Sequence, residues 1–232
     1  MNAKRGYVPE DERNFSPEAL STLKTASRHV AFLIDEGYDP KQASAFVGNH
    51  FLLSERQRLA IVRSLAAKDQ LIGRRRRERS LDSVSGEEVL IDGFNTVITL
   101  EVLLSGSPLL VCMDGTVRDL AALRGTYRII PETYGAVGML LDVLRETGIR
   151  GATVFLDEPV SNSGRLKALI AEMGEAVPFA LDIRVLRDVD RALYGRENVV
   201  TTDSVILDRC LSWLNLTALC LKRHGGQGLR VW

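Results

Sequence analysis

Val89-Leu90-Ile91-Asp92-Gly93-Phe94-Asn95 decides the fold of this 232-residue chain, because here a short apolar strand runs directly into an acidic turn. Three other apolar runs end in the same way, namely residues 109–113 before Asp114, 152–156 before Asp157 and 199–202 before Asp203. In an open parallel sheet, the residues just beyond the carboxyl ends of the strands line one crevice. Carboxylates gathered there repel one another unless a cation lies between them. The sequence therefore predicts a divalent-metal site at one edge of an α/β sheet.

From residue 88 onward, short β-rich runs alternate with amphipathic helical patterns, which is typical of βαβ units and a parallel sheet. One helix is expected between residues 130 and 152, with Gly148 as its stop, and another between Ser161 and Gly174. The expected strands are 89–91, 109–113, 127–130, 152–156, 183–186 and 199–201, and the sequence leaves 228–232 open as a last edge strand.

The first third of the chain has a different pattern. Helix starts at Ser16-Pro17, Asp39-Pro40 and Ser54, each followed by apolar residues at helical spacing, predict a small bundle of three helices. Four regions are therefore expected: a flexible arm over residues 1–15, a helical module over 16–72, a basic linker over 73–87 and an α/β domain over 88–232.

The charge of the chain is unevenly distributed, although the formal net charge is zero. Residues 1–80 carry 15 Lys and Arg against 10 Asp and Glu, and residues 81–232 carry 15 against 20. A basic front half before an acidic half suggests a module that contacts a polyanion, joined to one that binds metal. The run Arg74-Arg75-Arg76-Arg77 supplies much of this excess, and it is equally compatible with a solvated linker.

The cysteines and the hydropathy pattern indicate where the protein works. Cys112, Cys210 and Cys220 lie in apolar surroundings without the spacing of a zinc site, so we expect small buried hydrophobes in a reducing cytoplasm. No stretch reaches the ~18 uninterrupted apolar residues that a membrane span needs. The sequence therefore predicts a cytoplasmic protein without a membrane partner, and it leaves the oligomeric state open.

Two further motifs have both a structural and a functional interpretation. Thr201-Thr202-Asp203 begins a helical pattern that carries Asp208 about one turn later, and Asp203 can cap that helix with or without binding metal. Asp114-Gly115-Thr116 is similar to the phosphatase motif of the haloacid dehalogenase superfamily. Cys112 stands where that motif needs its nucleophilic aspartate, so Asp114 is instead a candidate outer member of the acidic cluster.

These residues together resemble the PIN-like superfamily, and especially its NYN branch. The first strand of that branch ends in an Asp-Gly-Tyr-Asn type of signature, which Asp92-Gly93-Phe94-Asn95 matches with Phe for Tyr. Thr201-Thr202-Asp203 is similar to a late Thr-x-Asp element of PIN domains. The resemblance covers about residues 88–224. The whole chain, including Leu53-Ser54-Glu55-Arg56-Gln57-Arg58, also resembles a prokaryotic family known only as a conserved domain of unknown function.

The PIN-like resemblance implies a three-layer fold around a central parallel sheet and a metal-dependent ribonuclease site. It implies that Asp92 is the central metal ligand and Asp203 a second, with Asp157 and Asp208 as candidates for the remaining acidic positions and Asn95 orienting a metal-bound water. PIN domains usually carry an acidic residue on a mid-chain helix, and Glu132, Asp142 and Asp157 compete for that role. Mg²⁺ or Mn²⁺ suits such oxygen ligands. The expected catalytic set is Asp92, Asn95, Asp157 and Asp203, and the expected metal ligands are Asp92, Asp114, Asp157, Asp203 and Asp208.

An acidic site needs cations nearby to hold the phosphates of RNA. The candidates before the first strand are Arg74, Arg75, Arg76, Arg77 and Arg79, and those within the domain are Arg118, Arg124 and Arg128. Aromatic residues make up only 6% of the chain, which argues against sequence-specific stacking on single strands.

The first hypothesis is therefore a ribonuclease that hydrolyses RNA with Mg²⁺ or Mn²⁺. The alternative is a non-catalytic scaffold on the same fold, in which the carboxylates mainly cap helices and the helical module contacts a protein or nucleic acid. A phosphatase is a third hypothesis.

Overall fold

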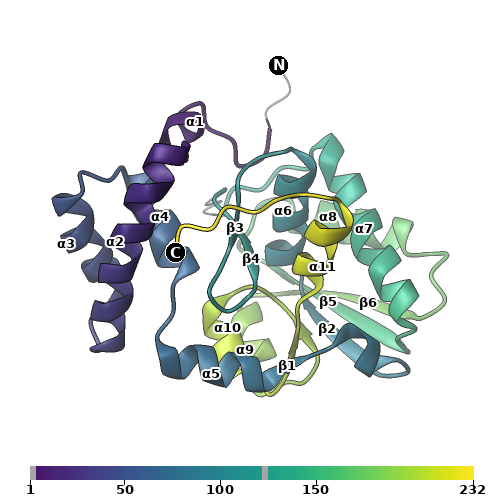
Figure 1. Cartoon of the computed structure of the whole chain (residues 1–232). Helices are drawn as coiled ribbons and strands as arrows, with labels where there is room; N and C mark the ends of the chain where they lie inside the picture. The colour runs from purple at the N-terminus through teal and green to yellow at the C-terminus, as the bar shows by residue number, and fades with distance from the viewer. Residues whose placement is uncertain (1–3, 122–124) are drawn as a thin grey trace.

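The computed structural model of the chain describes residues 4–121 and 125–232, and a parallel sheet lies at its centre (Figure 1). Its six strands are β1 (Glu78–Arg79), β2 (Glu88–Asp92), β5 (Gly151–Asp157), β6 (Ala180–Leu186), β7 (Val199–Val200) and β8 (Trp213–Leu214). They lie side by side in the order β1-β8-β7-β2-β5-β6, and every neighbouring pair is parallel. The strand β2 therefore has β7 on one side and β5 on the other.

Helices cover both faces of this sheet, so the predicted three-layer α/β fold is confirmed. In β2, Val89 and Ile91 point into the core on one face, and Leu90 packs against the core on the other. The helices of the first face are α6 (Gly93–Leu104), α7 (Pro131–Thr147), α8 (Ser163–Met173) and α11 (Leu216–Arg223), and those of the second are α9 (Val189–Leu193) and α10 (Ser204–Arg209).

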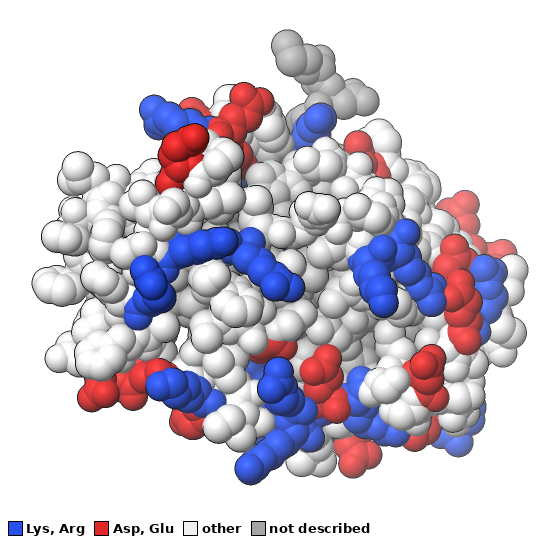
Figure 2. Space-filling model, in the orientation of Figure 1, with Lys and Arg blue, Asp and Glu red and all other residues white. Residues whose placement is uncertain are grey.

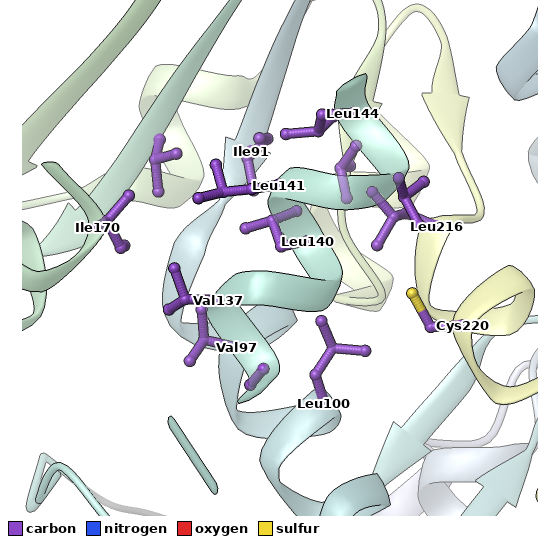
Figure 3. Packing of buried hydrophobic residues seen from close by; sticks show 14 of the residues in the cluster. Ile91, Val97, Leu100, Val137, Leu140, Leu141, Leu144, Ile170, Leu216 and Cys220 are labelled. Atoms are coloured by element: carbon purple, nitrogen blue, oxygen red, sulfur yellow. The ribbon is translucent and has the colours of Figure 1, made fainter. Parts of the chain in front are cut away.

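The larger core lies between the sheet and α6, α7, α8 and α11 (Figure 3). The helix α7 presents Leu140 and Leu144 to it at helical spacing, and both side chains are completely buried against α6 and the sheet. Gly148 ends this helix in the left-handed conformation with φ +68°, as the sequence predicted.

Three of the helices that precede the sheet, α2, α3 and α4, begin where the sequence predicted, whereas α1 and α5 were not predicted. Ser16 and Asp39 accept hydrogen bonds from the first turns of their helices, and Ser54 forms a capping box with Gln57. The helices of this region are α1 (Asp11–Asn14), α2 (Pro17–Asp35), α3 (Pro40–His50), α4 (Glu55–Ser64) and α5 (Lys68–Arg77).

A small antiparallel hairpin, β3 (Leu109–Val111) with β4 (Val117–Asp119), lies between the first four helices and the rest of the chain (Figure 1). The strand expected at 109–113 is therefore present, but it does not join the central sheet. Leu109 packs in the core of the α/β domain, while Leu110 and Cys112 pack among the N-terminal helices. Leu120 and Val231 also belong to that second core, so the α/β region completes the core of the helical module.

The segments expected to be an arm and a linker are folded instead. Arg5 forms an ion pair of 2.8 Å with buried Glu101, and Arg56 forms one of 2.7 Å with buried Asp11, so residues 4–15 are fastened to the protein. Within residues 73–87, the arginine run is the last turn of α5, Glu78–Arg79 is an edge strand, and Leu81–Val84 is a 3₁₀ helix.

The strand expected at 127–130 is absent, and the edge strand left open at 228–232 does not form among the described residues. Residues 127–130 form no strand, and Leu229 makes an isolated bridge to Leu110. None of the helices in residues 4–121 and 125–232 combines the length and the apolar character needed to cross a membrane.

Candidate active site

Three adjacent strands of the sheet, β7, β2 and β5, end at one cavity of about 240 Å³. The cavity is the crevice at the carboxyl ends of the strands, and it lies at β2, which has neighbouring strands on both sides. Larger hollows exist elsewhere, such as one of about 460 Å³ beside α11, but that one is mainly apolar. The carboxylates that line the smaller cavity belong to Asp92, Asp119, Asp157, Asp190 and Asp203.

Gly93 allows the chain to enter α6 directly behind Asp92. A Cβ atom at this position would lie 2.7 Å from the backbone oxygen of Phe155 in β5 and equally close to the Leu156 side chain. Only glycine therefore allows α6 to begin this close to the neighbouring strand. The Asp-Gly pair of the sequence motif thus holds Asp92 at the mouth of the cavity.

Asp92 is the most deeply buried of these carboxylates, with 5% of its surface exposed. Burial raises the pKa of Asp92 to about 8, and the charges of Asp203, Asp157 and Asp190 add to this shift. A hydrogen bond of 2.8 Å from Thr201 Oγ1 opposes the shift without cancelling it. The Asp92 carboxyl therefore holds a proton at neutral pH unless a bound cation displaces that proton.

The other carboxylates come from the neighbouring strand ends. Burial raises the pKa of Asp157, and the charge of Asp188 acts in the same direction. Asp190 lies in α9 at the exposed rim, where partial desolvation and then the charges of Asp203 and Asp157 raise its pKa. Asp203 caps α10 through Oδ1, which accepts hydrogen bonds from the backbone of Val205 at 2.8 Å and Ile206 at 3.2 Å.

Asn95 connects the start of α6 to the loop after β7. Its Oδ1 accepts hydrogen bonds from the backbone N–H of Thr202 at 3.1 Å and from Thr202 Oγ1 at 2.5 Å. Because the amide oxygen is occupied, the group that Asn95 offers to the cavity is its Nδ2 donor. A donor suits a phosphate oxygen or a water oxygen better than it suits a metal ion.

The carboxylates surround the cavity without forming a closed cage. In the described parts of the chain, no three His, Cys, Asp or Glu side chains are close enough to hold a metal ion together. One oxygen of Asp92 is bonded to Thr201, and one oxygen of Asp203 caps a helix. Each of these two side chains therefore has a second carboxylate oxygen for another partner.

Asp114 and Asp208, which were expected to join the metal site, form a separate cluster with an arginine. Arg74 donates to Asp208 at 2.7 and 2.8 Å and to Asp114 at 2.7 Å, and Arg118 donates to Asp114 at 2.6 Å. Burial alone would raise the pKa of Asp114, but Arg118, Thr116 and Arg74 together bring it below its ordinary value. Neither carboxylate lines the cavity.

The arginines expected to bind RNA differ in their exposure to solvent. Arg74 and Arg118 are 2% and 7% exposed, so they are interior ion-pair partners rather than surface contacts. Arg79 is bonded to Glu87 and Asn198. The exposed side chains are those of Arg75, Arg76 and Arg128. Arg77 is half-buried, and Arg124 lies outside the described residues.

The exposed arginines do not surround the carboxylate cavity. Arg75 and Arg76 line another hollow, beside Arg230 and Trp232 of the C-terminal tail. Figure 2 shows Lys and Arg side chains over α5, the C-terminal tail and α11, with Asp and Glu side chains among them at the lower edge. The basic front half of the sequence therefore does not form a single continuous surface on this face.

Sequence reasoning missed several residues of the cavity. Asp190 follows the end of β6, so the rule that identified the other aspartates applied to it as well. Asp119 lies in the hairpin, and Arg63 lies in α4 of the helical module, so neither follows a strand of the central sheet. Among the competing acids Glu132, Asp142 and Asp157, only Asp157 lines the cavity, and Asp142 pairs with Arg145 on the surface.

Comparisons with known proteins place the chain in a family. Residues 81–219 match the family described as "Domain of unknown function (DUF5616)", and residues 22–77 match "Protein of unknown function (DUF434)". The uncharacterised protein MJ0935 of Methanocaldococcus jannaschii is 33% identical over 186 residues, which cover 80% of this chain and 89% of that protein. No solved structure matches. The chain therefore belongs to the DUF5616 family, in which function is not assigned, and here a DUF434 region precedes the family domain.

Proposed function

We propose that this protein is a metal-dependent ribonuclease of the PIN-like type, which hydrolyses RNA phosphodiester bonds at the carboxylate cavity. The observation that carries the proposal is that three neighbouring parallel strands deliver Asp92, Asp157 and Asp203 to one cavity. Burial, and after it the charges of Asp203 and Asp157, raises the pKa of Asp92, as expected of a site that accepts a cation.

The donor set fits Mg²⁺ or Mn²⁺. Mg²⁺ keeps several waters and commonly binds one or two carboxylates together with substrate phosphate, so it does not need a cage of three protein ligands. Asp92 and Asp203 each have one carboxylate oxygen for this purpose, and Asp157 lies on the opposite side of β2 from the Asp203 loop. Asp92 together with either Asp203 or Asp157 would hold the ion directly, the third carboxylate would act through metal-bound water, and Asp190 at the rim would add negative charge.

The metal ion and Asn95 would then divide the tasks of hydrolysis. When bound, the metal ion lowers the pKa of water and stabilises negative charge on the phosphate. Asn95 Nδ2 would donate to a phosphate oxygen, while Thr202 fixes its orientation through Oδ1. The attacking water oxygen bonds to phosphorus, the bond from phosphorus to the leaving ribose oxygen breaks, and one water proton ends on that oxygen.

Incubation of the purified full chain with labelled single-stranded RNA, with Mg²⁺, with Mn²⁺ or with EDTA, tests this proposal. We expect cleavage with the metal ions only, and loss of cleavage in Asp92→Asn. The exposed substitution Asp182→Asn serves as the matched control, because Asp182 lies on β6 and its side chain pairs with surface Arg184. RNA binding without cleavage under all metal conditions would instead support the scaffold alternative, in which Asp203 acts as a helix cap.

A further inference from the structure

Arg63 brings a positive charge from the helical module to the carboxylate cavity. It lies in the last turn of α4, and it is the one Lys or Arg side chain, among residues 4–121 and 125–232, that lines this cavity. About a third of its side chain is exposed, so the guanidinium is accessible to a ligand that enters from solvent. The family profile of the α/β region begins at residue 81, so Arg63 lies outside it.

The backbone at Arg63 is held in place by the hairpin of the α/β region. Arg118 Nη1 donates to the Arg63 backbone oxygen at 2.6 Å, and the Met113 N–H donates to the backbone oxygen of Ser64 at 2.9 Å. Arg118 is itself fixed by Asp114 and by the backbone oxygen of Thr202. The buried ion-pair cluster therefore connects the end of α4 to the same loop that carries Asp203.

The guanidinium group of Arg63 is anchored at one nitrogen. Its Nη1 donates to the backbone oxygen of Asp119 at 2.6 Å, and the Asp119 carboxylate lies 3.6 Å from Nη1. That carboxylate already accepts a hydrogen bond of 2.7 Å from the Ala121 N–H. In the described residues, neither Nε nor Nη2 of Arg63 has a hydrogen-bond partner, which leaves two charged donors beside the cavity.

A phosphate needs such donors in a cavity lined by five carboxylates. Metal ions neutralise part of that charge, but the non-bridging oxygens of a phosphodiester also need N–H donors. Guanidinium is well suited to this task because its donors match the spacing of phosphate oxygens and it stays charged at every working pH.

We propose that Arg63 of the helical module binds the scissile phosphate of the RNA, so that residues from both family regions form a single active site. This inference rests on the proposed ribonuclease function and assigns a substrate contact to α4. It gives the helical module a direct role at the chemical centre, in place of a separate partner-binding role.

The test uses the full chain with the substitutions Arg63→Gln and Arg63→Lys, and with Arg28→Gln as the matched control. Arg28 lies exposed on α2 of the same module and donates a hydrogen bond to nearby Thr25. With Mn²⁺ and labelled single-stranded RNA, we expect kcat/KM to fall about 10- to 100-fold in Arg63→Gln, because a positioned donor to the phosphate is lost. Arg63→Lys retains the charge but not the paired donors, so its loss should be smaller.

Binding gives a second readout that a purely structural role would not change. In the Asp92→Asn background, fluorescence anisotropy with the same RNA measures the dependence of affinity on salt. Arg63→Gln should reduce the slope of log affinity against log salt by about one charge, and Arg28→Gln should leave it unchanged. Unaltered circular dichroism and thermal midpoint in Arg63→Gln establish that the variant is folded.

Three results distinguish the two proposals. Cleavage by the wild type with a selective loss in Arg63→Gln supports both of them. Cleavage by the wild type with unchanged kcat/KM and salt slope in Arg63→Gln overturns the role of Arg63 and leaves the ribonuclease proposal intact. A wild type that cleaves no RNA with any metal overturns the ribonuclease proposal and, with it, the assignment of Arg63.

Discussion

Two groups of aspartates in this protein look alike in the sequence and lie in opposite electrostatic surroundings. Asp92 and Asp114 each follow an apolar run and precede a glycine. Asp92 lies in a cavity with other carboxylates, and its pKa is raised to about 8. Asp114 lies between Arg74 and Arg118, and its pKa is lowered.

The difference shows what separates a binding site from a structural ion pair. A buried carboxylate with two arginine partners has its charge neutralised within the protein, so it contributes to the architecture. A buried carboxylate whose neighbours are mainly other carboxylates keeps a charge that the protein does not neutralise, and a bound cation can balance it. Position at the end of a strand does not distinguish the two cases. They differ in whether the positive counter-charge comes from arginines of the protein or from a bound ligand.

The largest expected effect is on activity. Asp92→Asn should reduce metal-dependent RNA cleavage by roughly 1000-fold, because it removes the central charge that holds the ion. Asp208→Asn, in the other group, should retain full specific activity in the folded fraction. Initial rates with labelled RNA measure both variants, and equal losses in the two would remove the distinction between the groups.

A large effect on stability is expected in the group that contains arginine. Arg74→Met should reduce the free energy of unfolding by about 3 kcal/mol, because buried Asp114 loses one of its partners and Asp208 loses its main one. Urea unfolding followed by circular dichroism gives the value, with Arg75→Met on the exposed side of the same helix as control. A loss no larger than that of Arg75→Met would mean that this cluster contributes little to the fold.

The dependence of stability on pH should separate the groups further. The folded state of the metal-free protein holds a proton on Asp92 up to about pH 8, whereas the unfolded state releases it near pH 4. Stability should therefore fall as the pH rises between these values. The Asp92→Asn variant has no proton to release on unfolding at this position. The variant should therefore be more stable than the wild type by on the order of 2 kcal/mol at pH 8. Asp157 and Asp190, whose pKa values are also raised, contribute to the remaining slope in the same direction.

Urea midpoints measured from pH 4 to pH 9 without metal test this prediction. The contrary result is a wild type whose stability stays level across this range and falls only below about pH 4, as it would if Asp92 were paired in the way that Asp114 is.

The smallest expected effect is stabilisation by metal. Mn²⁺ at about ten times its dissociation constant should stabilise the folded state by about 1.4 kcal/mol, a rise of about 3 °C in the thermal midpoint. The rise should disappear in Asp92→Asn and persist in Asp208→Asn. NaCl at matched ionic strength is the control for screening, and a rise that depends on Asp208 instead would place the ion in the other group.

Much of the fold could be predicted from the sequence because its signals are local. The apolar strands ended by Asp92, Asp157 and Asp203 belong to one sheet, and the strand rule predicted that their ends share an edge. The same rule failed for Asp114, because its strand forms a hairpin outside the central sheet. Asp208 was assigned from its helical spacing after Asp203 and from the PIN-like resemblance, and neither reveals that its side chain points toward Arg74 in α5.

The partners of the charged residues could not be predicted, because they come from distant segments. Arg74 lies in a stretch whose composition resembles a solvated linker, yet it is almost completely buried between two aspartates. Arg63 reaches the cavity from another module, and no local pattern marks it. Asp190 could have been found, since it follows the end of a predicted strand.

The β3–β4 hairpin has a consequence for how this chain can be divided. Alternate residues of β3 face opposite ways: Leu109 faces the α/β core, and Leu110 faces the N-terminal helices. Severing the polypeptide between the two family regions would leave the helices without Leu110, Cys112, Leu120 and Val231, and would expose these apolar side chains on the other fragment. We expect each piece to aggregate when produced by itself and the pair to recover when coexpressed.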